Sequence, residues 1–280
     1  MALSAFIIYI GVIGIMMTTL TKRPVKTAIV TISSILFSAV TAEAQDVTVA
    51  IGAEWTTGDY GGDTDTDLFF VPLSLGLETN KWFVRASLPY LEIDGPGLFL
   101  GDNIPVVRGR GEPERGEDES VSGFSDLSLT AGHSFDLNSS GDLRLDLTGR
   151  VKVPTASDEN NLGSGEFDYS FAAGLSKVTG QWSHFGDIGY RITGDPEDRP
   201  LNDTLFATIG TSYLMRNSTT IGLAYDFSES ATPETDDSHE ISSWLSFRIH
   251  KKTRLQLYGL VGLSDGGPDY GIGTRIRFKL

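Results

Sequence analysis

The stretch LRLDLTGRVKV, residues 143–153, alternates between two kinds of side chain along its whole length. Its odd positions carry leucine, glycine or valine, and its even positions carry arginine, aspartate, threonine or lysine. Because successive side chains of a strand point to opposite faces, this period of two predicts a β-strand with one apolar and one polar face. Its length is close to the ~9–11 residues with which a tilted strand crosses a bilayer.

The same alternation recurs from residue 46 to the carboxyl terminus. We predict twelve strands, at residues 46–58, 66–79, 81–92, 122–135, 141–154, 166–178, 181–193, 202–215, 218–229, 238–249, 252–264 and 268–280. Short connections, such as Thr179–Gly180, alternate with long polar ones, such as Thr155–Gly165. An even number of strands joined in this way is typical of bacterial barrels. The predicted fold is therefore all-β, a transmembrane antiparallel β-barrel of twelve strands.

The polar faces of these strands argue against the alternative of a soluble β-sandwich or lipocalin-like barrel. A soluble core cannot hold many charges, whereas a water-filled lumen can. The candidate selectivity residues of the predicted lumen are its charged side chains: Arg144, Asp146, Arg150, Lys152, Asp168, Asp187, Arg191, Asp226, Arg248, Arg254, Arg275 and Arg277. Ion pairs between these charges would plug the lumen instead of selecting solutes, and the sequence leaves that alternative open.

Aromatic side chains near the predicted strand ends indicate where the barrel meets the lipid headgroups. Trp82 and Trp182 lie toward the short turns, and Tyr90 and Tyr190 lie toward the long loops. Girdles of this kind at both interfaces are typical of membrane barrels. The last predicted strand ends at Leu280, and we expect it to pair with the first strand because an open sheet edge is not tolerated in lipid.

The amino-terminal residues 1–44 predict a cleaved secretory signal peptide. A basic segment at 22–26 precedes an apolar stretch at 27–40, and Ala42-Glu43-Ala44 fits the small-residue cleavage pattern. We therefore expect residues 45–280 to form the mature outer-membrane β-barrel.

The apolar stretch before Lys22 has no role in such a peptide, which favours a true translation start at Met16 or Met17. The alternative is a membrane hairpin of two short helices, although each apolar stretch is marginal in length for spanning.

The composition excludes several classes of function. The chain has 37 acidic and 22 basic residues, a net charge of −15, so we expect no nucleic-acid partner. It contains no cysteine and only four histidines, which do not cluster, so we predict no metal site and no cofactor. His133 and His184 fall on the lipid-facing side, as in lipid-modifying barrel enzymes, but neither has a serine two residues away. We therefore predict no catalytic residue.

Two acidic loops remain open to more than one interpretation. Residues 63–67 alternate aspartate with threonine like the start of a calcium loop, but Leu68 stands where glycine is required. This favours a solvated loop, with weak sharing of divalent ions with lipopolysaccharide phosphates as the alternative. The long loop at 93–121 either extends outside the barrel or folds into the lumen as a constriction.

Several motifs of the chain resemble one family. They are Gly123-Phe124-Ser125-Asp126-Leu127, Val151-Lys152-Val153-Pro154-Thr155, the run from Asn161 through Leu162-Gly163-Ser164-Gly165 to Tyr169, Gly189-Tyr190-Arg191 and Gly194-Asp195-Pro196. The family is the outer-membrane family labelled "MetA-pathway of phenol degradation". Ser125 stands where that family usually has glycine. The resemblance implies a transporter-like barrel for aromatic or other small compounds, and it supplies no site residues.

These observations favour a barrel in the bacterial outer membrane that passively conducts small solutes, aromatic or hydrophobic compounds among them. Its expected partners are outer-membrane lipids and lipopolysaccharide, small-molecule solutes, and the barrel-assembly machinery during insertion. The first alternative is a structural or adhesive barrel with a plugged lumen. The second is a lipid-modifying outer-membrane enzyme.

Overall fold

The computed structural model describes residues 46–62, 64–96, 120–156, 162–196, 200–233 and 235–280. The predicted signal peptide at 1–44, its cleavage site and the proposed starts at Met16 and Met17 lie outside these residues. Most of the acidic loop at 93–121 also lies outside them, so the two interpretations of that loop stay predictions. No helix among the described residues is long and apolar enough to span a membrane.

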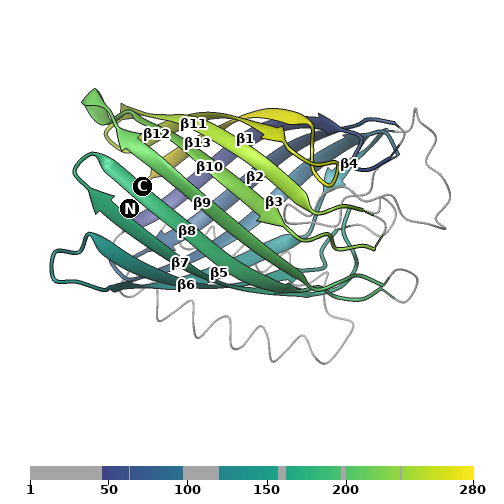
Figure 1. Cartoon of the computed structure of the whole chain (residues 1–280), viewed down its shortest axis with the longest axis horizontal. Coiled ribbons are helices and arrows are strands. Elements are labelled where there is room, and N and C mark those ends of the chain that lie inside the picture. The colour runs from purple at the N-terminus through teal and green to yellow at the C-terminus, as the bar shows by residue number, and fades with distance from the viewer. Residues whose placement is uncertain (1–45, 63, 97–119, 157–161, 197–199, 234) are drawn as a thin grey trace. The chain divides into compact units, whose positions relative to one another are not determined.

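The described residues form a closed antiparallel β-barrel of tilted strands (Figure 1). The strands are β1 (Asp46–Gly58), β2 (Thr66–Glu78), β3 (Trp82–Asp94), β4 (Ser120–Phe124), β5 (Leu127–Asp136), β6 (Leu143–Val153), β7 (Asp168–Thr179), β8 (Trp182–Ile192), β9 (Thr204–Leu214), β10 (Thr220–Ser228), β11 (Ser238–His250), β12 (Thr253–Gly262) and β13 (Tyr270–Lys279). A single 3-10 turn, η1 (Arg216–Ser218), joins β9 to β10 in this part of the chain. The predicted all-β transmembrane barrel is confirmed.

The predicted strand at 122–135 is divided in two, which corrects its boundaries. β4 pairs with the end of β3 near the long loops, and β5 pairs with the end near the turns. Within the described residues, β4 and β5 together therefore occupy one of the twelve strand positions around the barrel. The break falls at Ser125 and Asp126, whose side chains bond to the loop that follows β6 instead of standing free on a strand face.

The barrel closes between its first and last strands, as expected. β1 and β13 pair from Thr48 opposite Lys279 to Thr57 opposite Tyr270. The Leu280 amide also donates a hydrogen bond to the Val47 carbonyl, at 2.8 Å. This pairing leaves no strand edge open where β13 meets β1.

The outer face of the barrel is apolar and exposed, and the inner face is polar. Phe171, Ile209 and Ile272 are 61%, 66% and 64% exposed. Inward positions instead carry buried hydroxyls, such as those of Ser170 and Ser246. Exposed apolar surface on nearly every strand is costly in water and favourable in lipid, so the barrel is built to stand in a bilayer.

The two ends of the barrel differ in their connections and carry aromatic side chains. At the turn end, Trp182 lies 4.8 Å from Tyr213 between ring centroids, and Trp82 lies 4.3 Å from His133. At the loop end, the Tyr190 hydroxyl donates to an Asp203 carboxylate oxygen at 3.2 Å. These rings have apolar bodies and polar tips, which suits the boundary between lipid and water.

Candidate solute channel

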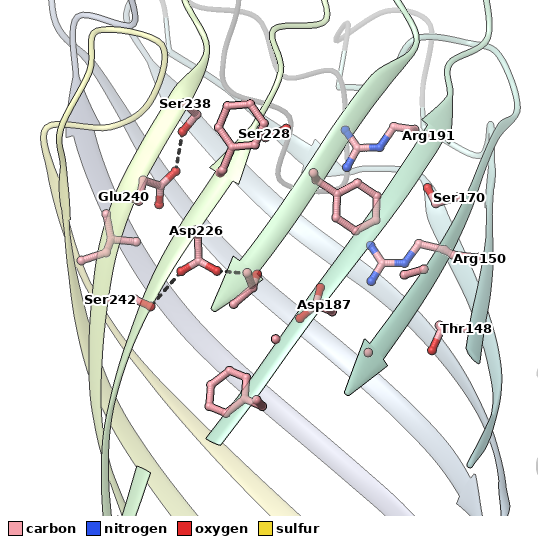
Figure 2. A pocket seen from close by; sticks show the side chains of 18 of the residues that line it. Thr148, Arg150, Ser170, Asp187, Arg191, Asp226, Ser228, Ser238, Glu240 and Ser242 are labelled. Atoms are coloured by element: carbon pink, nitrogen blue, oxygen red, sulfur yellow. Dashed lines mark hydrogen bonds between the residues drawn. The ribbon is translucent and has the colours of Figure 1, made fainter. Parts of the chain in front are cut away.

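A cavity of about 910 Å³ occupies the inside of the barrel. It extends from Ser176, near the turn end of β7, to Pro268 in the loop between β12 and β13. Polar residues from β1, β6, β7, β8, β10 and β11 line it together with aromatic rings. Figure 2 shows labelled charges facing one another across this space, with Asp226 and Glu240 on one side and Arg150 and Arg191 on the other.

A row of three carboxylates and one hydroxyl crosses four neighbouring strands on one wall. Asp187, Thr208, Asp226 and Glu240 are successive register partners from β8 to β11. Thr208 and Ser242 donate hydrogen bonds to the two Asp226 oxygens at 2.8 and 3.0 Å (Figure 2). Bonds of this kind orient a carboxylate and leave part of its acceptor capacity directed at water.

Glu54 on β1 extends this acidic wall. The Tyr258 hydroxyl of β12 donates a hydrogen bond to its carboxylate. The Ser238 hydroxyl, in the same way, donates to the Glu240 carboxylate at 2.8 Å. Both glutamates line the cavity, and the sequence reasoning did not include them among the candidate residues. Their inward parity was the available signal, because each lies two residues from other lumen-facing polar positions.

A second row, of basic and hydroxyl side chains, crosses the adjoining strands up to β8. Arg85, Thr130, Arg150, Ser170 and Arg191 are successive register partners from β3 to β8. The Arg191 guanidinium stands 5.9 Å from the centroid of the Phe206 ring. The predicted lumen residues Asp146, Arg150, Asp187, Arg191 and Asp226 thus all line the cavity.

The remaining predicted arginines lie toward the turn end. Arg248, Arg254 and Arg277 are register partners across β11, β12 and β13. Arg254 donates to the Ser246 hydroxyl at 3.1 Å, and Arg277 forms an ion pair with Glu78. Arg275 lies two residues farther from the turn on β13.

Arg144 differs from the other predicted arginines. It forms a half-exposed ion pair with Asp136 at the rim, 3.3 Å between Nε and Oδ1. An exposed pair of this kind contributes little energy and places its charge outside the cavity.

The predicted residues Lys152 and Asp168 do not face the cavity. The side chain of Lys152 is 1% exposed, and its Nζ lies 3.2 Å from Asp126 and 2.9 Å from Asp168. It also donates to the Ser164 hydroxyl at 2.6 Å. We call Lys152, Asp126 and Asp168 the mouth latch. Because these three charges are buried and paired, they act on the structure of the mouth.

The mouth latch holds two loops against the barrel wall. Asp126 accepts hydrogen bonds from the amides of Thr155 and Ala156, at 2.9 and 3.0 Å. Asp168 accepts one from the Gly194 amide at 3.0 Å. The motifs that resemble the family are therefore brought together in space at the loop end, where they tie β5, β6 and β7 to the loops that follow β6 and β8.

Part of the loop after β6 folds over the wall. Leu162 is fully buried against the inward-facing Leu68, Leu91 and Ile93 of β2 and β3. The Ser125 hydroxyl donates to the Leu162 carbonyl at 2.6 Å. This apolar contact places part of the loop on the lumen side of β2 and β3, where it narrows the lumen. Sequence reasoning missed the contact because a single leucine in a polar loop shows no periodicity.

The inward aromatic rings lie against glycines on neighbouring strands. Phe206 is opposite Gly189, and Phe185 is opposite Gly210 in the register of β8 and β9. A Cβ built on either glycine would lie less than 3.0 Å from the ring. Since only glycine leaves room there, the rings lie flat on the wall and the lumen remains open.

The loop end of the cavity is acidic and partly desolvated. Burial raises the pKa of the Tyr60 hydroxyl to about 12, with Glu240 and Glu54 adding to the rise and a hydrogen bond with Thr56 opposing it. Desolvation likewise raises the pKa of Asp269, and the nearby carboxylates of Asp59, Asp65 and Asp265 raise it further. Both shifts reflect negative charge concentrated at this end.

His133 and His184, the two histidines on the lipid-facing side, pack among aromatic rings. His133 lies 4.3 Å from Trp82 and 4.2 Å from Phe135 between centroids. His184 stacks on Trp182, and its Nδ1 is 3.1 Å from the Thr211 hydroxyl. Within the described ranges, no three His, Cys, Asp or Glu side chains are placed to hold a metal ion.

The family described as "Putative MetA-pathway of phenol degradation" matches residues 40–280. Among solved structures, the chain is similar to an outer membrane channel from Pseudomonas putida F1, with 17% identity and a TM-score of 0.65, over 84% of this chain and 95% of that chain. It is also similar to the KdgM porin, with 10% identity and a TM-score of 0.48, over 83% of this chain and 99% of that chain. No curated protein matches it.

Proposed function

The chain belongs to this family, and on that premise we propose that it is an outer-membrane channel through which small solutes pass passively. One observation carries the proposal: a cavity of about 910 Å³, lined with fixed charges, lies inside a barrel whose outer face is apolar. In a barrel with only a structural role, oriented charges around a water-filled lumen would bring no benefit, because the partial burial of each charge costs desolvation free energy. A channel uses them to attract and orient solutes.

The lining also supports a class of solute. The rings of Phe70, Phe83, Phe185, Phe206 and Phe227 contribute to the cavity together with the charges. Ring faces held flat on the wall provide apolar contact for a passing aromatic compound, while the carboxylates and guanidiniums keep the path hydrated. We propose small solutes in general, aromatic compounds included, with no chemistry performed by the barrel. Lipopolysaccharide and the assembly machinery remain its proposed partners.

The test is conductance of the purified protein in planar bilayers, with solute flux into proteoliposomes as a second readout. We expect discrete single-channel steps and uptake of small neutral and aromatic solutes. An absence of both current and flux would overturn the channel proposal.

A structural barrel with a plugged lumen is the second candidate. The observation that favours it is the inward fold of Leu162 together with the mouth latch, which narrows the lumen at the loop end. A sealed barrel predicts no steps in the wild type but steps in a Lys152→Met variant, in which the latch is broken. Steps in both proteins would exclude the plug.

A further inference from the structure

We propose that the lumen carries two oppositely charged zones in series, and that ion current through it therefore rectifies. The inference rests on the proposed channel function and adds a direction to it. The carboxylate zone consists of Glu54, Asp187, Asp226 and Glu240. The arginine zone consists of Arg85, Arg248, Arg254, Arg275 and Arg277.

Strand β11 shows that the zones are separated along the barrel. Glu240 is the third residue from its loop end, and Arg248 is the third from its turn end. The two are eight residues apart, about 26 Å along the strand at about 3.3 Å per residue. With a strand tilt of about 40°, about 20 Å of this lies along the barrel axis.

The other strands keep the same order. Asp226 is the seventh of nine residues of β10, which runs from the turn end to the loop end, so it lies toward the loops. Arg277 is the third residue from the turn end of β13, and Arg254 is the second residue of β12. Arg85 on β3 is close enough to Arg275 and Arg277 to interact with them electrostatically.

Charges of the opposite sign reduce the net charge of each zone but do not cancel it. Arg150 and Arg191 lie across the cavity from Asp226 and Glu240 (Figure 2). Their two positive charges against the four carboxylates leave a net charge of −2 among these lining residues of the loop half. Glu78 and Asp146 oppose the five arginines, which leaves a net charge of +3 in the turn half. The acidic loop residues Asp59, Asp65, Asp265 and Asp269 add negative charge at the loop mouth.

Salt decides whether the two zones act separately. The Debye length is about 10 Å at 0.1 M ionic strength and about 3 Å at 1 M. The axial separation of Glu240 and Arg248 exceeds both lengths, so on this wall each zone holds its own counterions: cations beside the carboxylates and anions beside the arginines. At 1 M salt each charge is screened over a distance much shorter than the width of the lumen, so the effect of both zones on the current becomes small.

Rectification follows from this arrangement of counterions. When the loop side is positive, cations move from the carboxylate zone toward the arginines and anions move the opposite way, so both ions accumulate where the zones meet. When the voltage is reversed, both ions are drawn away from that junction and the current falls. We therefore expect the larger current with the loop side positive.

The experiment measures single-channel current at equal voltages of opposite sign in 0.1 M and 1 M KCl. Because the chain has no cysteine, an Asn202→Cys variant in the exposed loop after β8 allows a membrane-impermeant thiol reagent, added to one side, to report the orientation of each barrel. The test variants are Asp226→Asn with Glu240→Gln, and Arg248→Gln with Arg254→Gln. The matched control, Asp136→Asn with Asp142→Asn, removes two carboxylates at a turn outside the cavity.

We expect a current ratio of about two or more in 0.1 M KCl that approaches one in 1 M KCl. Either zone variant should bring the ratio toward one in 0.1 M KCl. The turn variant removes negative charge on the side of the arginine zone and should therefore not lower the ratio. A linear current in the wild type, or a ratio unaffected by both zone variants, would overturn the two-zone inference and leave the channel proposal intact. Absence of any current would overturn the channel proposal itself.

Discussion

Replacement of Lys152 by methionine should destabilise the barrel strongly. The ammonium of this buried lysine lies 3.2 and 2.9 Å from the carboxylates of Asp126 and Asp168, which are themselves almost fully buried. Methionine fills a similar volume but removes the positive charge, so two carboxylates remain buried without their counterion. Loss of one member of a buried ion pair costs about 3–5 kcal/mol.

The loss should be recovered when the stranded charges are removed. Asn at position 126 can still accept the Thr155 and Ala156 amides through its side-chain oxygen, and Asn at 168 can still accept the Gly194 amide. The triple variant Lys152→Met, Asp126→Asn, Asp168→Asn should therefore be clearly more stable than the single variant. The triple variant should remain less stable than the wild type because it lacks the hydrogen bond that Lys152 donates to Ser164.

The assay is reversible urea unfolding of the barrel in lipid vesicles, followed by tryptophan fluorescence. Lys177→Met is the matched control, because Lys177 is exposed near the turn end of β7 and should change the free energy of unfolding by less than about 0.5 kcal/mol. A loss below about 1 kcal/mol for Lys152→Met would refute the reasoning. The same holds if the triple variant is no more stable than the single one.

Other predictions address the lumen, the closing strand and the amino terminus. Gly189→Ala should lower single-channel conductance, because its methyl group would push the Phe206 ring off the wall, whereas Gly174→Ala adds a methyl group at a lumen glycine without a facing ring and should have little effect. Deletion of 278–280 should reduce the amount of heat-modifiable, membrane-inserted protein, since β1 would lose partners at its turn end and unsatisfied backbone groups in lipid cost several kcal/mol each; normal amounts would contradict this. Mass spectrometry of the membrane-extracted protein should find a chain that begins at Gln45, and a retained segment 22–44 would instead support the anchored hairpin.

Most of the fold could be predicted from local pattern. Alternation over segments such as 143–153 predicted a strand and also the face on which each charge lies, because the pleat of a strand ties side-chain direction to a period of two. That is why Asp146, Arg150, Asp187, Arg191 and Asp226 were assigned to the lumen and do line the cavity. The polar loops and short turns then indicated the antiparallel order of the strands.

The partners of those charges depended on the register and tilt of strands far apart in the chain. Parity alone treats Lys152 and Arg150 alike, since they lie two residues apart on the same face of β6. Only the folded barrel brings Asp126 and Asp168 to Lys152, and only the break between β4 and β5 frees Asp126 to meet the loop after β6. The sequence by itself therefore determined which face of its strand each side chain takes, because the pleat fixes that face within a single strand. The tertiary structure decided which side chains meet, because the pairing of strands sets the position of each residue along the barrel relative to its neighbours.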